Sequence, residues 1–211
     1  MNASDFSKES ISRSAFFTGH RFLKHEDLPA IRMKVDQCVS EAYESGYRRF
    51  FCGCALGFDT VAAFRVIFLK KQYPDIRLSL AIPCATQAER WDSEDRKTYD
   101  QLLQKADDCT VLSPFYYQGA MLSRNRYMAD RSSLCICWLS NMRSGTASAV
   151  RYAIIHRQMK VINLALQEDS SNDRLREKTW NYIFTSPSAD KNAITAPLHL
   201  LRDRKLTFKN T

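Results

Sequence analysis

The sequence predicts an α/β fold in three layers, in which a mostly parallel sheet lies between two layers of helices. Short apolar runs that end at a glycine, a proline or a polar turn have the length and composition of buried strands. Segments with apolar residues at helical spacing lie between most of these runs. Strands that alternate with helices form βαβ units, which place the strands parallel and the helices on both faces of the sheet.

The first half of the chain begins with a predicted strand over residues 15–18, which ends at Gly19. Apolar residues from position 28 onward then repeat at helical spacing up to a glycine stop at residue 46, which predicts a helix. A second strand is predicted over residues 49–52. Residues 59–72 are apolar on nearly all sides, which predicts a well-buried helix.

The second half of the chain continues the alternation. Its predicted strands and helices are a strand over 76–82, a charged helix over about 87–105, a strand over 109–112, a helix over about 122–131, a strand over 134–139, a helix that follows Gly145 and a strand over 161–164. We therefore expect one α/β domain over residues 15–166. Residues 1–14 are predicted to be a disordered polar leader and residues 167–211 a C-terminal appendage, with helical character only at 177–184.

The composition is that of a soluble globular protein of 211 residues, with 45% hydrophobic and 26% charged residues. Neither an apolar segment long enough to cross a membrane nor a signal-peptide pattern is visible, so we expect a cytoplasmic protein with no membrane partner. The net charge of +8 leaves nucleic acid open as a partner. Since the basic residues are spread along the chain and often lie beside acidic ones, a basic surface with an anionic small ligand is favoured.

The seven cysteines are odd in number and lie mostly in strand-like runs, which is typical of reduced core thiols. Cys52 and Cys54, like Cys135 and Cys137, form CxC rather than CxxC pairs, so no metal site is predicted. No cofactor is predicted either.

The segment Ser144-Gly145-Thr146 follows the predicted strand 134–139 and opens a helix. The first backbone N–H groups of a helix have no partner within it, and the helix dipole adds positive potential there, so such a turn binds anions. Two such turns in one α/β chain would point to a nucleotide-like ligand. The second is the stretch from Gly53 through Gly57 to Asp59, where Asp59 either accepts from a ribose hydroxyl or caps the following helix.

The first predicted strand ends in Thr18-Gly19-His20-Arg21, where glycine permits close approach of a backbone or a phosphate. His20 has two interpretations, a structural hydrogen-bonding residue or an acid/base group. Trp91 lies beyond the third strand, where it either stacks on a base or begins an amphipathic helix.

Arg124 lies on a predicted helix face that it shares with Met121, Met128 and Arg131. Arginine is seldom buried without a partner, so either these arginines pair with acids such as Asp130 or the face lines a polar pocket. The pocket is favoured for Arg124, because a guanidinium group matches the geometry of a phosphate. Asp130 is also four residues beyond Arg126, with which it can form a surface pair.

These motifs, in this order, resemble the SLOG superfamily, whose Rossmann-like members include the DprA and LOG proteins, and most of all its YpsA-like branch. The resemblance spans about residues 15–165 and implies a three-layer Rossmann-like sandwich that binds nucleotides or nucleotide-derived ligands. The LOG enzymes remove the base from nucleoside monophosphates, using an arginine that matches Arg124 and a glutamate whose position here is Ala149. Asn125 also replaces a lysine of their motif, so the phosphate-binding part of the pattern is kept and the acid/base part is not.

We therefore expect the chain to bind or sense a nucleotide or a nucleotide-derived small molecule. The alternatives are an N-glycosidase or phosphoribohydrolase, which would need Asp59, Glu89 or Asp130 as its acid or base, and a DprA-like binder of single-stranded DNA. No catalytic residue is assigned, and a homo-oligomer is compatible with the sequence. The expected ligand-binding residues are Thr18, Gly19, His20, Arg21, Gly53, Gly57, Asp59, Arg124, Asp130, Ser144, Gly145 and Thr146.

Overall fold

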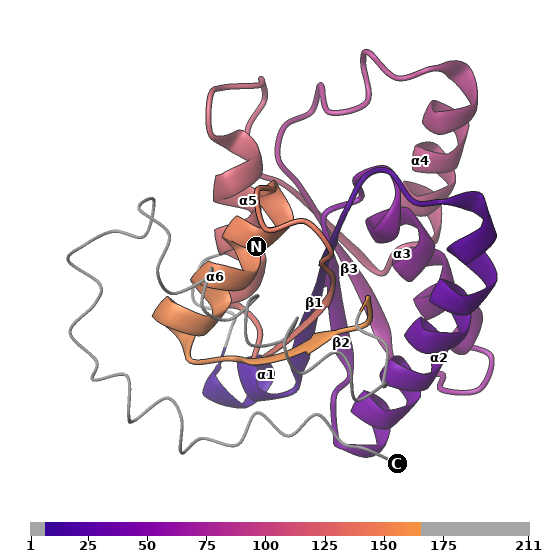
Figure 1. Cartoon of the computed structure of the whole chain (residues 1–211), viewed down its shortest axis with the longest axis vertical. Helices are drawn as coiled ribbons and strands as arrows, with labels where there is room; N and C mark the ends of the chain where they lie inside the picture. Colours follow the sequence, from indigo (N-terminus) through magenta and orange to yellow (C-terminus); the bar gives the residue numbers. More distant parts are fainter. Residues whose placement is uncertain (1–6, 166–211) are drawn as a thin grey trace.

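A six-stranded, all-parallel sheet forms the centre of the molecule in the computed structural model, which describes residues 7–165 (Figure 1). The strand order is β4-β3-β2-β1-β5-β6. The strands are β1 (Ser14–Gly19), β2 (Arg49–Cys52), β3 (Arg77–Ile82), β4 (Asp108–Val111), β5 (Leu134–Trp138) and β6 (Lys160–Asn163). The predicted fold class, an α/β sandwich with a parallel sheet, is confirmed.

Helices cover both faces of this sheet, which gives the three layers (Figure 1). On one face lie α2 (Leu28–Glu44), α3 (Phe58–Leu69) and α4 (Ser93–Lys105), and on the other lie α5 (Ala120–Asp130) and α6 (Gly145–Arg157). A short 3-10 turn, η1 (His25–Asp27), precedes α2. Among residues 7–165, no helix is both long enough and apolar enough to span a membrane.

The central strands are apolar on both sides because each side packs against helices. Along β1, Ala15 and Phe17 contact the core under α2 and α3, and Phe16 contacts the core under α5 and α6. All three side chains are fully buried. This double burial explains why the strands appear in the sequence as continuous apolar runs rather than as alternating patterns.

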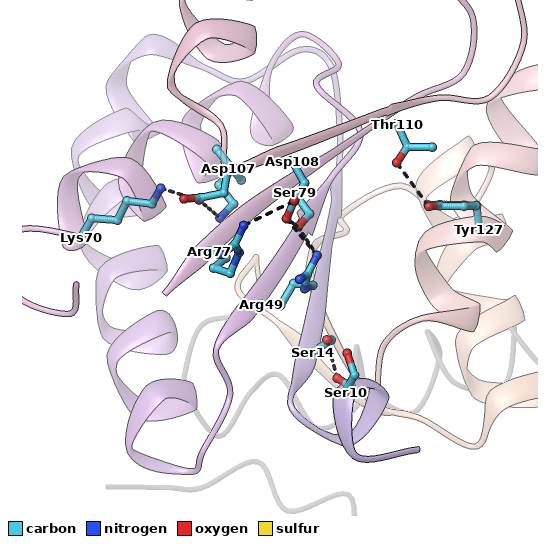
Figure 2. Close-up of polar contacts among 11 residues, drawn as sticks. Ser10, Ser14, Arg49, Lys70, Arg77, Ser79, Asp107, Asp108, Thr110 and Tyr127 are labelled. Atoms are coloured by element: carbon cyan, nitrogen blue, oxygen red, sulfur yellow. Dashed lines mark hydrogen bonds and ion pairs between the residues drawn. The ribbon is translucent and has the colours of Figure 1, made fainter. Parts of the chain in front are cut away.

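Polar contacts fix the strands at the β4 edge (Figure 2). Asp108 on β4 accepts hydrogen bonds from Arg49 Nη1 on β2 at 2.9 Å and from Ser79 Oγ on β3 at 3.0 Å. Asp107, which directly precedes β4, pairs with Lys70 at the end of α3. These contacts hold in place a four-residue edge strand in which two residues are exposed and the other two only partly buried.

Two predicted boundaries differ from the structure because local capping overrides the apolar pattern. The charged helix expected from residue 87 begins at Ser93, since the Asp92 carboxylate accepts from the Asp95 N–H at 2.8 Å. Residues 8–14 are not disordered: Lys8–Ser12 form α1, capped by Ser7, and Ser14 opens β1. The Ser14 hydroxyl also donates to the Ser10 carbonyl oxygen at 2.7 Å (Figure 2).

Other predictions for the termini fall beyond the described residues. These are the leader over residues 1–6, the appendage over 167–211 and its helical stretch at 177–184. The division of the chain at residue 166 stays a prediction.

The cysteines are free thiols, and all but Cys109 are buried. Burial raises the pKa of Cys38 and of Cys54 to about 12. Their thiols stay protonated at neutral pH, which agrees with the expectation of core thiols.

The order of the strands reverses between β1 and β5, which are neighbours although three strands separate them in the sequence. In open parallel sheets, the loops beyond the carboxyl ends of the strands diverge at such a point and leave a crevice. The segments that follow Gly19 and Trp138 therefore form the walls of the candidate site.

Candidate functional site

A cleft of about 310 Å³ lies beyond the carboxyl ends of the central strands. Segments that follow β1, β2, β3 and β5 line it, together with the first half of α5. The lining residues are Thr18, Gly19, His20, Arg21, Ala55, Leu56, Asp59, Gln87, Trp91, Met121, Arg124, Asn125, Ser144, Gly145 and Thr146. Nine of the twelve residues expected at the site are among them; Gly53, Gly57 and Asp130 are not.

One wall of the cleft is the N-terminus of α6. Ser144 caps the helix: its hydroxyl oxygen accepts from the Ala147 N–H at 3.1 Å and its hydroxyl donates to the Asn141 carbonyl oxygen at 2.7 Å. The N–H groups of Gly145 and Thr146 have no acceptor among residues 7–165. Both residues line the cleft, and a Cβ built on Gly145 would have nothing within 4 Å.

His20 holds the loop that carries this helix start. Its Nε2 atom accepts hydrogen bonds from the backbone N–H groups of Ser140 at 2.9 Å and Asn141 at 3.0 Å. An imidazole that accepts at Nε2 carries its proton on Nδ1 and is neutral. Burial lowers the pKa of His20, which favours that neutral form. The structural interpretation of His20 therefore fits better than a role in proton transfer.

Acid is expected to weaken this contact, because protonation of Nε2 removes the acceptor. The pKa of His20 is lower in the folded protein than its usual value near 6.5, so the unfolded chain binds more protons between the two values. The free energy of unfolding therefore rises with pH in that range, and the stabilisation from His20 is complete above about pH 6.5 and lost as the pH falls. Urea unfolding at pH 5 to 7.5 measures this slope.

His20→Gln is expected to reduce the slope below pH 6.5, since Gln does not titrate. The matched control is His25→Gln, because His25 is exposed in η1 and lies outside the cleft. Equal slopes in wild type and His20→Gln would show that His20 does not hold the loop through its neutral form.

Arg124 and Asp59 form a buried pair at the base of the cleft. Arg124 Nη1 lies 3.5 Å from Asp59 Oδ2, and the two side chains are 7% and 5% exposed. Burial raises the pKa of Asp59, while Arg124 and the backbone amides of Ala55, Gly53 and Gly19 lower it. The sequence left two alternatives for Arg124, an ion pair with an acid or a position in the lining of a pocket. The structure shows both, since Arg124 pairs with Asp59 and lines the cleft.

Gly53 and Gly57 do not line the cleft, but neighbouring parts of the site occupy the space that a side chain on either would need. A Cβ on Gly53 would lie 1.2 Å from Arg124 Nη1, so only glycine leaves room for the guanidinium group. Gly57 has φ +84°, and a Cβ there would lie 2.1 Å from the Arg21 carbonyl oxygen. The predicted glycines of this turn therefore position Arg124 and the backbone at Arg21 rather than line the cleft.

Gly57→Ala is expected to destabilise the fold by about 3 kcal/mol, because it combines an unfavourable φ with a clash against backbone. For a chain of this size, that corresponds to a fall in Tm of roughly 6–12 °C. Gly119→Ala is the matched control, since Gly119 has φ +97° but open space around its Cβ. The control is expected to lose only about 1–2 kcal/mol. Equal losses in thermal unfolding would contradict the clash at Arg21.

Asp130 lies away from the cleft, at the C-terminal end of α5. Its carboxylate accepts from the Tyr152 hydroxyl at 3.0 Å and pairs with Arg157 at 3.6 Å. Asp130 lies six positions beyond Arg124, which on a helix of 3.6 residues per turn places them on different faces. The expected Arg126–Asp130 pair is not among the ion pairs of residues 7–165, and Arg126 lies over the Tyr152 ring.

Sequence reasoning missed Gln87 and Asn125, both 9% exposed and both in the lining. Gln87 lies in the turns between β3 and α4, and Asn125 is the neighbour of Arg124 on α5. A usable signal existed for Gln87, because it is a polar residue five positions beyond the end of a predicted strand. Trp91, left open by the sequence, also lines the cleft and packs edge-on against Tyr99 with ring centroids 5.4 Å apart.

Comparison with known proteins gives matches in both sequence and fold. The model of a family described as the YspA SLOG family matches residues 18–167. The SPbeta prophage-derived protein YoqJ of Bacillus subtilis is 29% identical over 117 residues, which are 50% of this chain and 68% of YoqJ. A UPF0398 protein of Macrococcus caseolyticus is 24% identical over 165 residues, which are 74% of this chain and 90% of the relative.

Two solved structures of DNA processing protein A share the fold. The protein from Helicobacter pylori, described with its single-stranded DNA binding mode, superposes with a TM-score of 0.55 at 17% identity, over 83% of this chain and 80% of that one. The protein from Streptococcus pneumoniae has a TM-score of 0.55 at 16% identity, over 79% of this chain and 56% of that one. At these identities the likeness establishes the architecture alone.

Proposed function

The chain belongs to the YspA SLOG family, and on that premise we propose that it binds or senses a nucleotide or nucleotide-derived ligand in the cleft. The observation that carries the proposal is the pair of N–H groups at Gly145 and Thr146, which have no acceptor among residues 7–165 and lie in the lining of the same cleft as the Arg124 guanidinium group. Backbone donors at a helix N-terminus and an arginine are the groups with which proteins bind phosphate.

The residues of the cleft suit binding better than hydrolysis. Asp59 is the only carboxylate in the lining, and its contacts with Arg124 and backbone amides occupy it as a structural anchor. Glu89 and Asp130, the other acids considered for proton transfer, do not line the cleft. Chromatography of nucleoside monophosphates after incubation with high protein concentrations tests the hydrolase alternative; released base would support it.

Thermal unfolding with AMP, ADP, ADP-ribose and NAD tests the proposal. A ligand at a hundred times its dissociation constant stabilises the folded state by about 2.7 kcal/mol. For a chain of this size, we expect a rise in Tm of roughly 5–11 °C with at least one of these compounds. No shift with any of them at millimolar concentration would contradict the proposal.

Single-stranded nucleic acid is the second candidate, favoured by an exposed aromatic run before α5. Phe115, Tyr116 and Tyr117 are 72%, 64% and 44% exposed, and bases stack on aromatic side chains of this kind. The net charge of +8 would add attraction to phosphates. The affinity for a single-stranded oligonucleotide, measured at several salt concentrations, tests this candidate. The logarithm of the affinity should fall against the logarithm of the salt concentration with a slope near −0.7 per phosphate contact. Affinity independent of salt, or no affinity, rules this candidate out.

A further inference from the structure

The Gln87 side-chain amide forms hydrogen bonds through its nitrogen but none through its oxygen. Its Nε2 donates to the carbonyl oxygens of Cys54 at 2.7 Å and Gly53 at 3.4 Å. Its Oε1 is buried and has no hydrogen-bond partner among residues 7–165. A buried polar group without a partner is unusual in a folded protein and calls for an explanation.

The orientation of this amide is set by its surroundings. A flipped amide would place Oε1 against two carbonyl oxygens, and three acceptors cannot hydrogen-bond to one another. Gly53 and Cys54 do not line the cleft, whereas Gln87 does. The amide nitrogen is therefore held by backbone behind the lining, and Oε1 is the end of the amide that a ligand would have to satisfy.

A second buried group without a partner occurs in the same lining. Arg124 Nε is buried and makes no hydrogen bond within residues 7–165, although Arg124 Nη1 faces Asp59. The cleft thus combines an unsatisfied acceptor from Gln87 with an unsatisfied donor from Arg124.

We propose that Gln87 selects the base of the bound nucleotide by accepting a hydrogen bond from an exocyclic amino group. This inference rests on the proposed function, and it narrows the ligand to nucleotides of amino-bearing bases. Adenine and cytosine carry an exocyclic amino group of this kind. Trp91 adds an aromatic surface to the same lining on which such a base can stack.

The test compares nucleotides that differ at this group. In AMP and IMP, and in CMP and UMP, an amino group is replaced by a carbonyl oxygen, and the neighbouring ring nitrogen gains a hydrogen, in a molecule of nearly the same size. A carbonyl oxygen at this position would oppose Gln87 Oε1 and leave it unsatisfied. If the protein binds purine nucleotides, we therefore expect AMP to bind about 10-fold or more tightly than IMP in titration calorimetry, and if it binds pyrimidine nucleotides, CMP to bind tighter than UMP by the same factor.

Gln87→Met keeps about the length of the side chain and removes both the Oε1 acceptor and the Nε2 donor, so the ratio of affinities is expected to fall to about two-fold or less. Gln37→Met, on an exposed face of α2, is expected to keep the wild-type ratio. A general loss of folding would weaken the binding of both nucleotides in a pair equally and leave the ratio of their affinities unchanged. A loss of base selection would change that ratio. Similar affinities within each pair for the wild-type protein would overturn the inference and leave nucleotide binding standing. No binding of any of the four would overturn both.

Discussion

Gly145→Asp is expected to abolish the binding of phosphate-bearing nucleotides while the fold stays intact. The new carboxylate would lie at the start of α6, beside the N–H groups of Gly145 and Thr146, and nothing lies within 4 Å of its Cβ. It would repel an anionic ligand and compete for the donors. Hydrogen bonds to a charged group contribute about 1.5–3 kcal/mol each, so losing two corresponds to an affinity loss on the order of 100-fold or more. Titration calorimetry with the nucleotide that gives the largest thermal shift measures the change.

The matched control is Gly145→Ala, which adds a Cβ without a charge. Since nothing lies within 4 Å of that Cβ, alanine is expected to retain both Tm and affinity. An acidic residue in the first turn of a helix is favourable by about 0.3–1 kcal/mol, so Gly145→Asp should not lower Tm in the absence of ligand. Nucleotide binding that is equal in the aspartate and alanine variants would show that the phosphate lies elsewhere.

The central sheet could be predicted from the sequence because its strands are buried on both faces. Phe50, Phe51 and Cys52 point alternately to the two cores, yet all three are apolar, so the run is visible without a periodicity. The start of α4 could not be predicted from apolar spacing, since a single side-chain cap at Asp92 sets it. The short α1 escaped prediction for the same reason, because polar residues and the Ser7 cap form it.

The parts of the candidate site that could be predicted are those formed by residues that follow one another in the sequence. A strand, a glycine turn and a helix follow one another around Gly145, so the open helix start is visible in the sequence. The contact between Arg124 and Asp59 joins residues 65 positions apart, and no spacing rule reveals it. Gln87 enters the cleft only because the segment after β3 folds toward β2, which depends on the order of the strands.

Three parts of the cleft are held in place by contacts within the protein. His20 holds the loop before α6, Gly53 makes room for Arg124, and Gly57 lets the backbone at Arg21 pass close by. Groups that are fixed before a ligand arrives lose little conformational entropy on binding. Two of these three residues, Gly53 and Gly57, lie outside the lining, so substitutions there are expected to change the site without touching the ligand.

Arg124→Met is expected to lower the free energy of unfolding by about 3–5 kcal/mol at neutral pH, because it leaves the Asp59 carboxylate buried without its counter-charge. The loss should depend on pH. Burial already raises the pKa of Asp59, and removal of Arg124 raises it further, since Arg124 lowers it in the wild type. Between the unfolded pKa near 3.9 and this raised value, the folded variant binds more protons than the unfolded chain. Its stability therefore falls as the pH rises through that range.

Asp59→Asn in the Arg124→Met background is expected to recover most of the lost stability, because it removes the charge that Arg124 compensates. The double variant should also lose the added pH dependence, which urea unfolding at pH 4 to 8 measures. Replacing both members of a buried ion pair is often close to neutral, whereas removing one is not. If the double variant were as unstable as Arg124→Met at every pH, the packing of Arg124 over Gly53, rather than its charge, would be what stabilises the floor of the cleft.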